Sequence, residues 1–480
     1  MLFNSLHFAI FFPIVLILYF ALPHRFRWIV LLAASYYFYM AWKPEYIILL
    51  IITTSIDYYA GIRMGRQAIK SKRTKYLILS LTANFLLLFS FKYFNFFNES
   101  LRMALQHYNI FYGVPALKVL LPVGISFYTF QSVSYAIDVY RGVKKPEPHP
   151  GIFAVYVAFF PQLVAGPIER STSLLPQFSE KHSFDYREAV DGLKLMAWGF
   201  FKKMVIADHL AYYVNAVYNK PADHTGLPLL IATYFFALQI FCDFSGYSDI
   251  AIGSARIMGF RLMTNFNQPY YAQSIAEFWK RWHISLSTWF KDYFYISLGG
   301  NRVSKWRWYF NLGATFLVSG LWHGANWTFI VWGGLHGFYM ILSILTERFR
   351  NTLSRFTYLS RFPKLHKYVK IFITYHLVLV SWVFFRANSL SDALFILRNM
   401  FNIDFAHLGL RMFVYRFSWE VAIPSILTLV LVHWVQRRIS ISQFLTQQPF
   451  WVRWPIYYVA VMYILIFGQF SEQAFIYFQF

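Results

Sequence analysis

The chain has 480 residues, of which 58% are hydrophobic and only 14% are charged. Soluble domains carry roughly 45–50% apolar and about 25% charged residues, so this chain has too few charges to cover a water-facing surface. These proportions exclude a soluble globular enzyme, a disordered chain and a disulfide scaffold, and they indicate a membrane protein with many spans. The single cysteine, Cys242, also excludes a multi-cysteine zinc site.

The charge balance predicts orientation in a bilayer and no nucleic-acid partner. Lys and Arg number 44 against 21 for Asp and Glu, and they gather in short stretches between apolar runs, as cytoplasmic loops do. We expect residues 63–75, residues 347–370 and the stretch around Arg437 to face the cytoplasm, which places the N-terminus outside. The first 27 residues are interpreted as a retained span, because their charges follow the apolar stretch.

The apolar runs predict an all-α polytopic protein with about eleven transmembrane helices plus re-entrant and interfacial helices. A span needs about 20 mostly apolar residues, and several runs are short or broken by Gly and Pro. We expect one membrane-embedded domain over residues 1–480, since no large polar loop and no internal repeat is visible. The candidate runs lie near residues 8–22, 28–43, 46–60, 76–97, 116–137, 151–166, 190–206, 228–257, 308–323, 326–346, 371–387, 420–435 and 452–469.

Two of these regions are predicted to be re-entrant. Residues 157–170 contain two prolines and a glycine, and residues 239–253 place Asp243 and Asp249 in an apolar context. Non-helical backbone at membrane depth survives only where protein or a cavity covers it. The two aspartates either orient a histidine or brace helices through buried hydrogen bonds.

Residues 276–295 are predicted to form one amphipathic helix along the cytoplasmic interface. Lys280 and Arg281 fall on the polar side, and Glu277 can pair with Arg281 one turn away. His283 lies in the middle of the apolar stripe, where it is either a buried structural histidine or a functional one. The stripe consists of Trp279, Trp282, His283, Leu286, Trp289, Phe290 and Tyr293.

Residues 311–340 are predicted to form a tight helical hairpin. Gly324 can end the first helix and Asn326 can cap the second, which puts His323 at the apex. A titratable group at a helix break in the bilayer is a candidate functional site, and the alternative is a turn in which His323 only hydrogen-bonds. His336, in the second helix beside glycines, is expected to serve packing.

Other chemistries have no support in the sequence. ATP-binding, serine-hydrolase, HExxH and dinucleotide motifs are absent. His283 and His323 lie 40 residues apart, and neither has a second histidine or carboxylate three or four residues on, so we predict no metal site.

Four stretches together resemble the membrane-bound O-acyltransferase (MBOAT) family, and most closely its bacterial alginate O-acetyltransferase branch. The resemblance covers most of the chain and is densest over residues 122–340. The pattern RWH-x-SLS-x-WF followed by WHG is specific. The stretches are FFPQLVAGPIER, FCDFSGYSDIAIG, NFNQPYYAQSIAEFWKRWHISLSTWFKDYFYISLGGNR and SGLWHGANWTFIVWGGLHG.

The resemblance implies a ring of transmembrane helices around a chamber that connects the two membrane faces. It implies His323 as the catalytic histidine and His283 as the second functional histidine. It also implies a multi-pass protein of the bacterial inner membrane that takes an acetyl group from a cytoplasmic thioester such as acetyl-CoA, with no bound cofactor. A periplasmic partner, of the SGNH type, would complete transfer to a polysaccharide.

The chemistry of acyl transfer suggests roles for several further residues. His323 would act as general base, and burial favours the neutral imidazole that this role needs. The oxyanion could be stabilised by Asn326, by the indole of Trp322 or Trp327, or by amides near Gly324. We also expect Trp279, Trp282 and Asp249 to line the substrate site, whereas Lys280, Arg281 and Lys291 either attract coenzyme A phosphates or only anchor the protein.

Two alternatives stay open. One is a polysaccharide or lipid transporter without acyl chemistry, which the lack of repeats and ATP motifs disfavours. The other is an acyltransferase of the same family that modifies a lipid or a protein, because a fold does not fix the acceptor.

Overall fold

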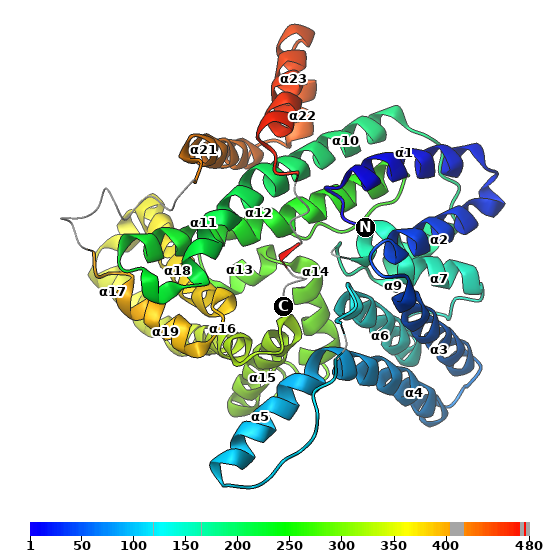
Figure 1. Ribbon diagram of the computed structural model, residues 1–480, viewed down its shortest axis with the longest axis horizontal. Coiled ribbons are helices and arrows are strands. Elements are labelled where there is room, and N and C mark those ends of the chain that lie inside the picture. Colours follow the sequence, from blue (N-terminus) through cyan, green and yellow to red (C-terminus); the bar gives the residue numbers. More distant parts are fainter. Residues whose placement is uncertain (119, 165, 404–416, 471–474, 477–480) are drawn as a thin grey trace. The chain divides into compact units, whose positions relative to one another are not determined.

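The computed structural model describes residues 1–480 except 119, 165, 404–416, 471–474 and 477–480. All the secondary-structure elements in these described residues are helices, which confirms the all-α prediction (Figure 1). The chain divides into two compact units, Met1–Leu193 with Ala251–Met263 and Lys194–Ile250 with Thr264–Phe480. Two helices, α10 (Tyr186–Phe200) and α12 (Leu227–Ile257), contribute residues to both units. A single domain over residues 1–480 stays a prediction, because compact units need not be separate domains.

The first unit is held together in part by a buried polar cluster. Ser80 and Asn84 of one helix both donate hydrogen bonds to the Asp57 carboxylate of the preceding helix, at 2.5 and 2.9 Å. All three side chains are fully buried, so these bonds satisfy a carboxylate that would otherwise be costly to bury. The helices that lie wholly in this unit are α1 (Leu6–Ala21), α2 (His24–Met40), α3 (Ile47–Gly65), α4 (Lys70–Leu88), α5 (Phe94–His107), α6 (Ile125–Arg141), α7 (Pro150–Ala158), α8 (Phe160–Leu163) and α9 (Ser171–Ser179).

The second unit contains the histidine-bearing stretches. A π-helical segment, η3 (Phe201–Ala207), joins α10 to the next helix, and a second one, η6 (Phe290–Tyr295), follows α14. The helices that lie wholly in this unit are α11 (Asp208–Tyr218), α13 (Ile275–Arg281), α14 (Ile284–Trp289), α15 (Lys305–His323), α16 (Trp327–Leu345), α17 (Glu347–Phe356), α18 (Pro363–Arg386), α19 (Leu390–Asn399), α21 (Trp419–Gln436), α22 (Ile441–Thr446) and α23 (Phe450–Phe467). Of the C-terminal stretch AFIYFQF, only Phe475 and Ile476 are among the described residues.

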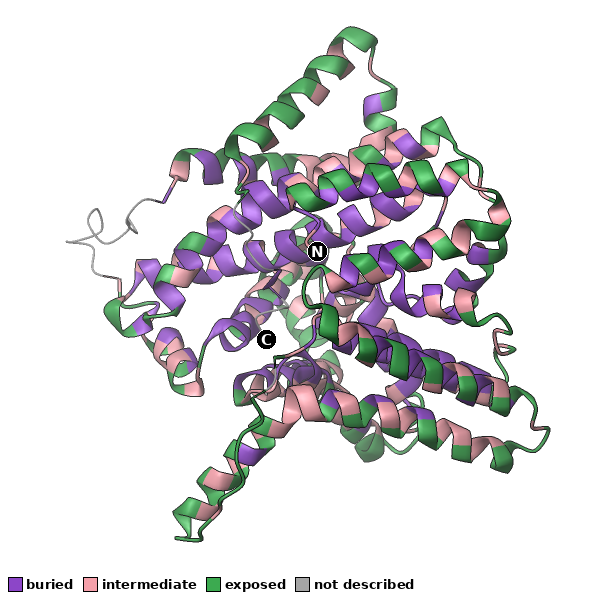
Figure 2. Ribbon diagram, turned by 45° about the vertical axis from the view of Figure 1, so that its right-hand side comes forward, coloured by how far each residue is buried: buried purple, intermediate pink, exposed green. Residues whose placement is uncertain are grey.

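Seven helical segments in the described part of the chain are long and apolar enough to cross a membrane. A further apolar helix, α1, is shorter. The chain is therefore a multi-pass membrane protein, although the predicted number of about eleven spans is not confirmed. The apolar window of α23 has no buried residue, and this helix is drawn mainly green in Figure 2, as expected of a lipid-facing surface. The segments are Pro44–Gly65, Lys70–His107, Leu227–Ile257, Trp327–Leu345, Pro363–Arg386, Trp419–Gln436 and Phe450–Phe467.

The prediction of a re-entrant segment at residues 239–253 is wrong, because α12 is continuous over 31 residues. The glycine in the middle of this stretch serves close packing. A Cβ on Gly246 would meet the Gly199 carbonyl oxygen of α10 at 2.7 Å, so only glycine allows the two backbones to approach this closely. Gly246 therefore marks a close contact between α12 and α10, and it does not break α12.

The predicted interruption at residues 157–170 is confirmed. Helix α7 ends at Ala158, and the four-residue α8 begins at Phe160 with Pro161 in its first turn. The Pro161 ring cannot continue an incoming helix but fits the first turn of a new one. Insertion of this break into the bilayer stays a prediction.

Helices α15 and α16 pack as a hairpin through small residues. A Cβ on Gly320 of α15 would overlap the Phe329 carbonyl oxygen of α16, and a Cβ on Gly333 of α16 would overlap the Phe316 carbonyl oxygen of α15. Such small-residue contacts let membrane helices approach closely. This contact holds the C-terminal end of α15, and with it His323, in place.

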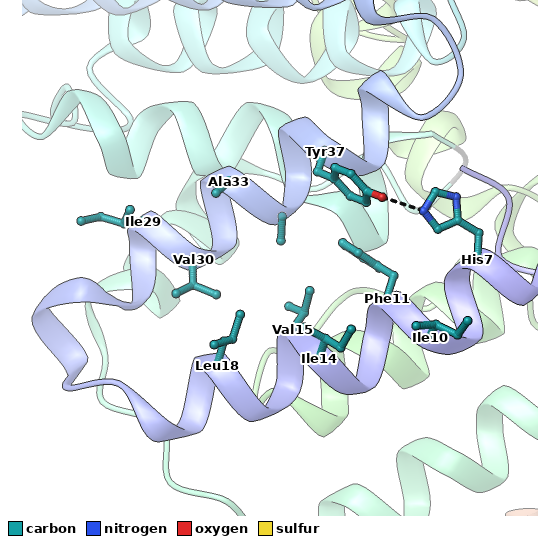
Figure 3. A pocket seen from close by; sticks show the side chains of 11 residues that line it. His7, Ile10, Phe11, Ile14, Val15, Leu18, Ile29, Val30, Ala33 and Tyr37 are labelled. Carbon is teal, nitrogen blue, oxygen red and sulfur yellow. Dashed lines mark hydrogen bonds between the residues drawn. The ribbon is translucent and has the colours of Figure 1, made fainter.

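An apolar groove runs between α1 and α2 in the first unit (Figure 3). Ile10, Ile14 and Leu18 of α1 line one side of it, and Ile29 and Val30 of α2 line the other. At one end His7 and Tyr37 are hydrogen-bonded at 2.9 Å. The groove offers almost no polar lining, which suits lipid chains and gives no basis for catalysis.

Candidate functional site

The hairpin prediction for residues 311–340 is confirmed in detail. Helix α15 ends at His323, Gly324 is its C-cap, and Asn326 is the N-cap of α16. The Asn326 side-chain oxygen accepts a hydrogen bond from the Thr328 amide at 3.0 Å, which satisfies one of the free amides at the start of α16. His323 therefore sits at the apex, and its side chain is buried with 2% exposure.

Residues 276–295 do not form the single helix predicted. Helix α13 ends at Arg281, and α14 starts at Ile284 after a break at Trp282 and His283. His283 has φ of 42°, in the left-handed region that a non-glycine residue adopts only at a cost. Trp282 and His283 are fully buried, so this stretch is packed into the protein and is not an interfacial helix on the surface.

A loop 18 residues earlier holds this strained turn. The Ile284 amide donates to the Asn265 carbonyl at 2.9 Å, and the Asn265 side-chain oxygen accepts from the Ser285 amide at 3.3 Å. The same oxygen lies 3.1 Å from His283 Nδ1. Because the backbone amide fixes the Asn265 orientation, His283 Nδ1 carries the proton and donates it, and the lone pair lies on Nε2.

Burial keeps His283 neutral. Removal of the ring from water disfavours the imidazolium and lowers the pKa of His283 to about 3. Phe244 packs against the His283 ring in a T-shaped arrangement at a centroid distance of 4.6 Å, and Phe266 stacks on it at 6.5 Å. A neutral imidazole with an oriented proton and a defined lone pair is the form that accepts a proton or a hydrogen bond from a hydroxyl group.

The two histidines share an aromatic partner, Trp322. Its ring centroid lies 5.0 Å from His323 and 6.2 Å from His283. Trp332 of α16 and Phe385 of α18 complete the surroundings of His323, at 4.9 and 5.5 Å. We call Trp322, Trp332 and Phe385 the aromatic wall. The structure thus brings together residues that are far apart in sequence.

The polar side of residues 276–295 lies where the pattern predicted. Lys280 and Lys291 are exposed, and Arg281 donates to Glu277 at 2.7 Å, the i,i+4 pair expected from the sequence. Because Arg281 forms an ion pair with Glu277, Lys280 and Lys291 are the cations more accessible to an anionic ligand.

His336 is held by two neighbours. The Trp279 indole donates to its Nδ1 at 3.3 Å, and its Nε2 lies 3.0 Å from the Ser381 hydroxyl. Because Nδ1 accepts, Nε2 carries the proton and donates it to Ser381, which in turn donates to the Val378 carbonyl. Both ring nitrogens are satisfied, which favours the packing role expected for His336. Trp279 is half-buried against this network and Trp282 packs at 5.0 Å from Trp382.

The candidate oxyanion donors have different surroundings. Asn326 uses its oxygen as a helix cap and its amide lies 3.4 Å from the Asn388 carbonyl. Trp327 is 48% exposed, whereas Trp322 is buried beside both histidines. The role of each of the three as an oxyanion donor stays a prediction.

A buried charge network, which the sequence reading missed in part, engages both aspartates of α12. Asp249 pairs with Lys202 at 2.7 Å, and Asp243 pairs with Lys203 at 2.8 Å. Lys203 also pairs with Asp208 at 2.8 Å. This supports the alternative in which the aspartates brace helices. Lys202 and Lys203, adjacent inside the apolar run 190–206, were the available signal, because such residues are costly in a bilayer unless they are paired.

Asn265 was also missed. It lies in a polar loop before Pro269, and nothing local in the sequence connects it with His283. Among the residues that the structure describes, no group of three or more His, Cys, Asp and Glu side chains is arranged to hold a metal ion.

The helices and the buried histidines define a multi-pass membrane protein with a candidate active site inside its second unit. Residues 147–385 match the MBOAT, membrane-bound O-acyltransferase family. The chain is 43% identical over 387 residues to the "Probable alginate O-acetylase AlgI" of Pseudomonas aeruginosa, which covers 80% of this chain and 71% of that protein.

Other relatives extend the range of acceptors. The "Peptidoglycan O-acetyltransferase" of Helicobacter pylori is 35% identical over 407 residues, 78% of this chain and 74% of that protein. The "Teichoic acid D-alanyltransferase" of Streptococcus thermophilus is 30% identical over 290 residues, 55% of this chain and 68% of that protein.

These similarities confirm the resemblance stated from the sequence. The chain belongs to the membrane-bound O-acyltransferase family, and it is an O-acyltransferase. The transporter alternative is correspondingly disfavoured.

Proposed function

We propose that this enzyme moves an acetyl group from a cytoplasmic thioester, such as acetyl-CoA, towards hydroxyl groups of a cell-surface polysaccharide. The names of its relatives support acetyl transfer to an envelope or exported polymer. In this proposal the enzyme lies in the bacterial inner membrane, and a periplasmic SGNH-type partner completes transfer to the polymer.

The observation that carries the proposal is that His323 and an oriented His283 are both buried and both contact the Trp322 ring. His323 is the proposed general base. It accepts the hydroxyl proton as the oxygen attacks the thioester carbonyl carbon, so that a C–O bond forms and the C–S bond breaks. The thiolate is a good leaving group, because thiols of this kind have a reference pKa near ~8.5. It then takes up the proton from His323. An ester and free coenzyme A result.

The other residues have supporting roles in this proposal. His283 accepts a hydrogen bond at Nε2 and positions the donor or the acceptor. The Trp322 indole or backbone amides near Gly324 stabilise the developing oxyanion. Trp279, Trp282, Trp327, Asn326 and Asp249 stay predicted contributors to the substrate site.

The cytoplasmic donor would be attracted by cations. Lys280 and Lys291 are exposed and have no ion-pair partner in the described part of the chain, so they can bind coenzyme A phosphates. Arg281, which is paired with Glu277, would contribute less.

The decisive variant is His323→Ala. We expect acetyl transfer to fall about 10²–10⁴-fold, the usual loss on removal of a positioned general base. Turnover is measured with labelled acetyl-CoA on protein whose expression and detergent stability match wild type. Near-normal turnover removes His323 from the mechanism.

A His283→Ala variant should also lose transfer, and unchanged transfer in that variant would refute the positioning role of His283.

A further inference from the structure

A cavity in the second unit combines hydrogen-bond donors, an acceptor and an aromatic ring. Its volume is about 770 Å³, and one side is a face of α11 (Asp208–Tyr218) and the residues just after it. Asn215 and Asn219, one turn apart, lie on this face together with Lys220. Gln469, from the segment after α23, lines another side.

Two asparagines present their amide donors because a buried arginine occupies their oxygens. Arg386 donates from one guanidinium nitrogen to the side-chain oxygens of Asn215 and Asn219, at 2.7 and 2.9 Å. In the described part of the chain their Nδ2 groups have no hydrogen-bond partner. Lys220 is exposed and has no ion-pair partner there either. Three donors thus line one side of the cavity.

The cavity also offers an acceptor and a flat ring. The Gln469 amide group contacts His209 through its nitrogen at 3.1 Å, which leaves its oxygen to accept. Tyr212, on α11, is 52% exposed and lines the same cavity. Paired donors, an acceptor and an exposed aromatic ring fit a ligand with several hydroxyl groups and an apolar ring face, which is the chemistry of a saccharide.

The cavity is connected to the proposed base through the C-terminal end of α18. Arg386 is the last residue of α18, and the preceding residue, Phe385, contacts the His323 ring at 5.5 Å. Two residues further on, the Asn388 carbonyl lies 3.4 Å from the amide of Asn326, in the apex that bears His323. The end of α18 and the residues just after it therefore contact both the asparagines of the cavity and the apex that bears His323.

The same helix gives the cavity's side of the membrane. Helix α18 starts at Pro363, inside the basic segment 347–370 that the charge pattern assigns to the cytoplasm. Its 24 residues extend for about 36 Å, enough to cross the hydrocarbon core. Arg386, and the asparagines bonded to it, then lie at the extracytoplasmic end.

We propose that this cavity is a saccharide-binding subsite that holds a sugar residue of the acceptor polymer at the extracytoplasmic face. The inference rests on the proposed function for the identity of the polymer as acceptor. It goes beyond that function in assigning direct saccharide recognition to this chain, where the partner alone was expected to handle the polymer.

The test uses a double variant, Asn215→Asp with Asn219→Asp. Each aspartate keeps the oxygen that Arg386 needs and removes one amide donor, so folding should be preserved. Full-length protein in nanodiscs is titrated calorimetrically with a neutral β-1,4-glucan tetrasaccharide and with a uronic acid tetrasaccharide. We expect both to bind wild type, and the double variant to weaken binding about tenfold or more, from the loss of two hydrogen bonds. The uronate should lose more, because carboxylates repel.

A control variant and the choice of readout distinguish a failure of this proposal from a failure of the proposed function. Asn301→Asp adds a carboxylate at an exposed position outside the cavity and should leave binding unchanged. The titration measures saccharide binding and not turnover, so a failure of the base assignment does not affect this measurement. No saturable binding to wild type, or equal binding by the double variant, overturns the proposal. The proposal is also overturned if neither tetrasaccharide binds and the double variant instead loses binding of a protein partner.

Discussion

At the scale of single residues, the main finding is that His283 owes its chemistry to Asn265. The left-handed turn, the proton on Nδ1 and the lone pair on Nε2 all follow from contacts with that one side chain and its backbone. A side chain that orients a histidine and fixes its tautomer is found in many active sites. Here burial adds a second constraint, since a charged His283 would be expensive in its aromatic surroundings.

The lowered pKa of His283 predicts a specific acid sensitivity. The pKa of an unfolded histidine is about 6.5, and burial lowers the pKa of His283 to about 3 in the folded protein. Between these values the unfolded state binds more protons, so His283 contributes stability above pH 6.5 that is lost as pH falls towards 3. We expect His283→Gln to flatten the fall of the apparent Tm between pH 6.5 and 4, measured by thermal scans in detergent. An identical pH dependence in both proteins would contradict a buried, neutral His283.

At the scale of elements, local signals predicted what local chemistry decides. The α15–α16 hairpin was predictable because Gly324 and Asn326 end and start helices through their own backbone and side chain. The break at His283 was not predictable, because its support comes from Asn265, 18 residues away. The continuity of α12 was missed for a related reason. Gly246 is required by close packing against the backbone of α10, which is far away in sequence.

The glycine contact between α15 and α16 predicts a steep difference between neighbouring substitutions. Gly320→Ala places a methyl group against the Phe329 carbonyl and should destabilise the protein by about 1–3 kcal/mol, seen as a lower apparent Tm and reduced turnover. Gly334→Ala meets only the Leu317 side chain at 3.6 Å and should be tolerated. Equal effects of the two substitutions would show that close helix packing does not position His323.

At the scale of the whole molecule, composition and charge predicted the class of protein, and they could not fix the number of spans. Short or kinked helices such as α7 and α8 give no clear hydropathy signal. The lysines of the buried charge network were visible in the sequence, but their partners were not predictable, because pairing depends on the tertiary fold. Lys202 pairs with Asp249, and Lys203 pairs with Asp208 and Asp243.

The predicted orientation can be checked with single cysteines. The native Cys242 is fully buried, so it should react little with membrane-impermeant maleimide. We expect Arg355→Cys, in the basic segment, to be labelled only from the cytoplasmic side. Lys220→Cys, at the extracytoplasmic cavity, should be labelled only from the other side. Labelling of both from one side would contradict the assigned positions of the two ends of α18.

The central claim is that His323 carries acyl transfer from a thioester on one side of the membrane to a hydroxyl on the other. The direct measurement supplies acetyl-labelled coenzyme A to the outside of sealed inside-out vesicles that contain the enzyme with its native neighbours. We expect base-labile label to accumulate on polymer inside the vesicles, and to be lost with His323→Ala. Label confined to the outer side, or unchanged transfer by the His323→Ala variant, would contradict the account.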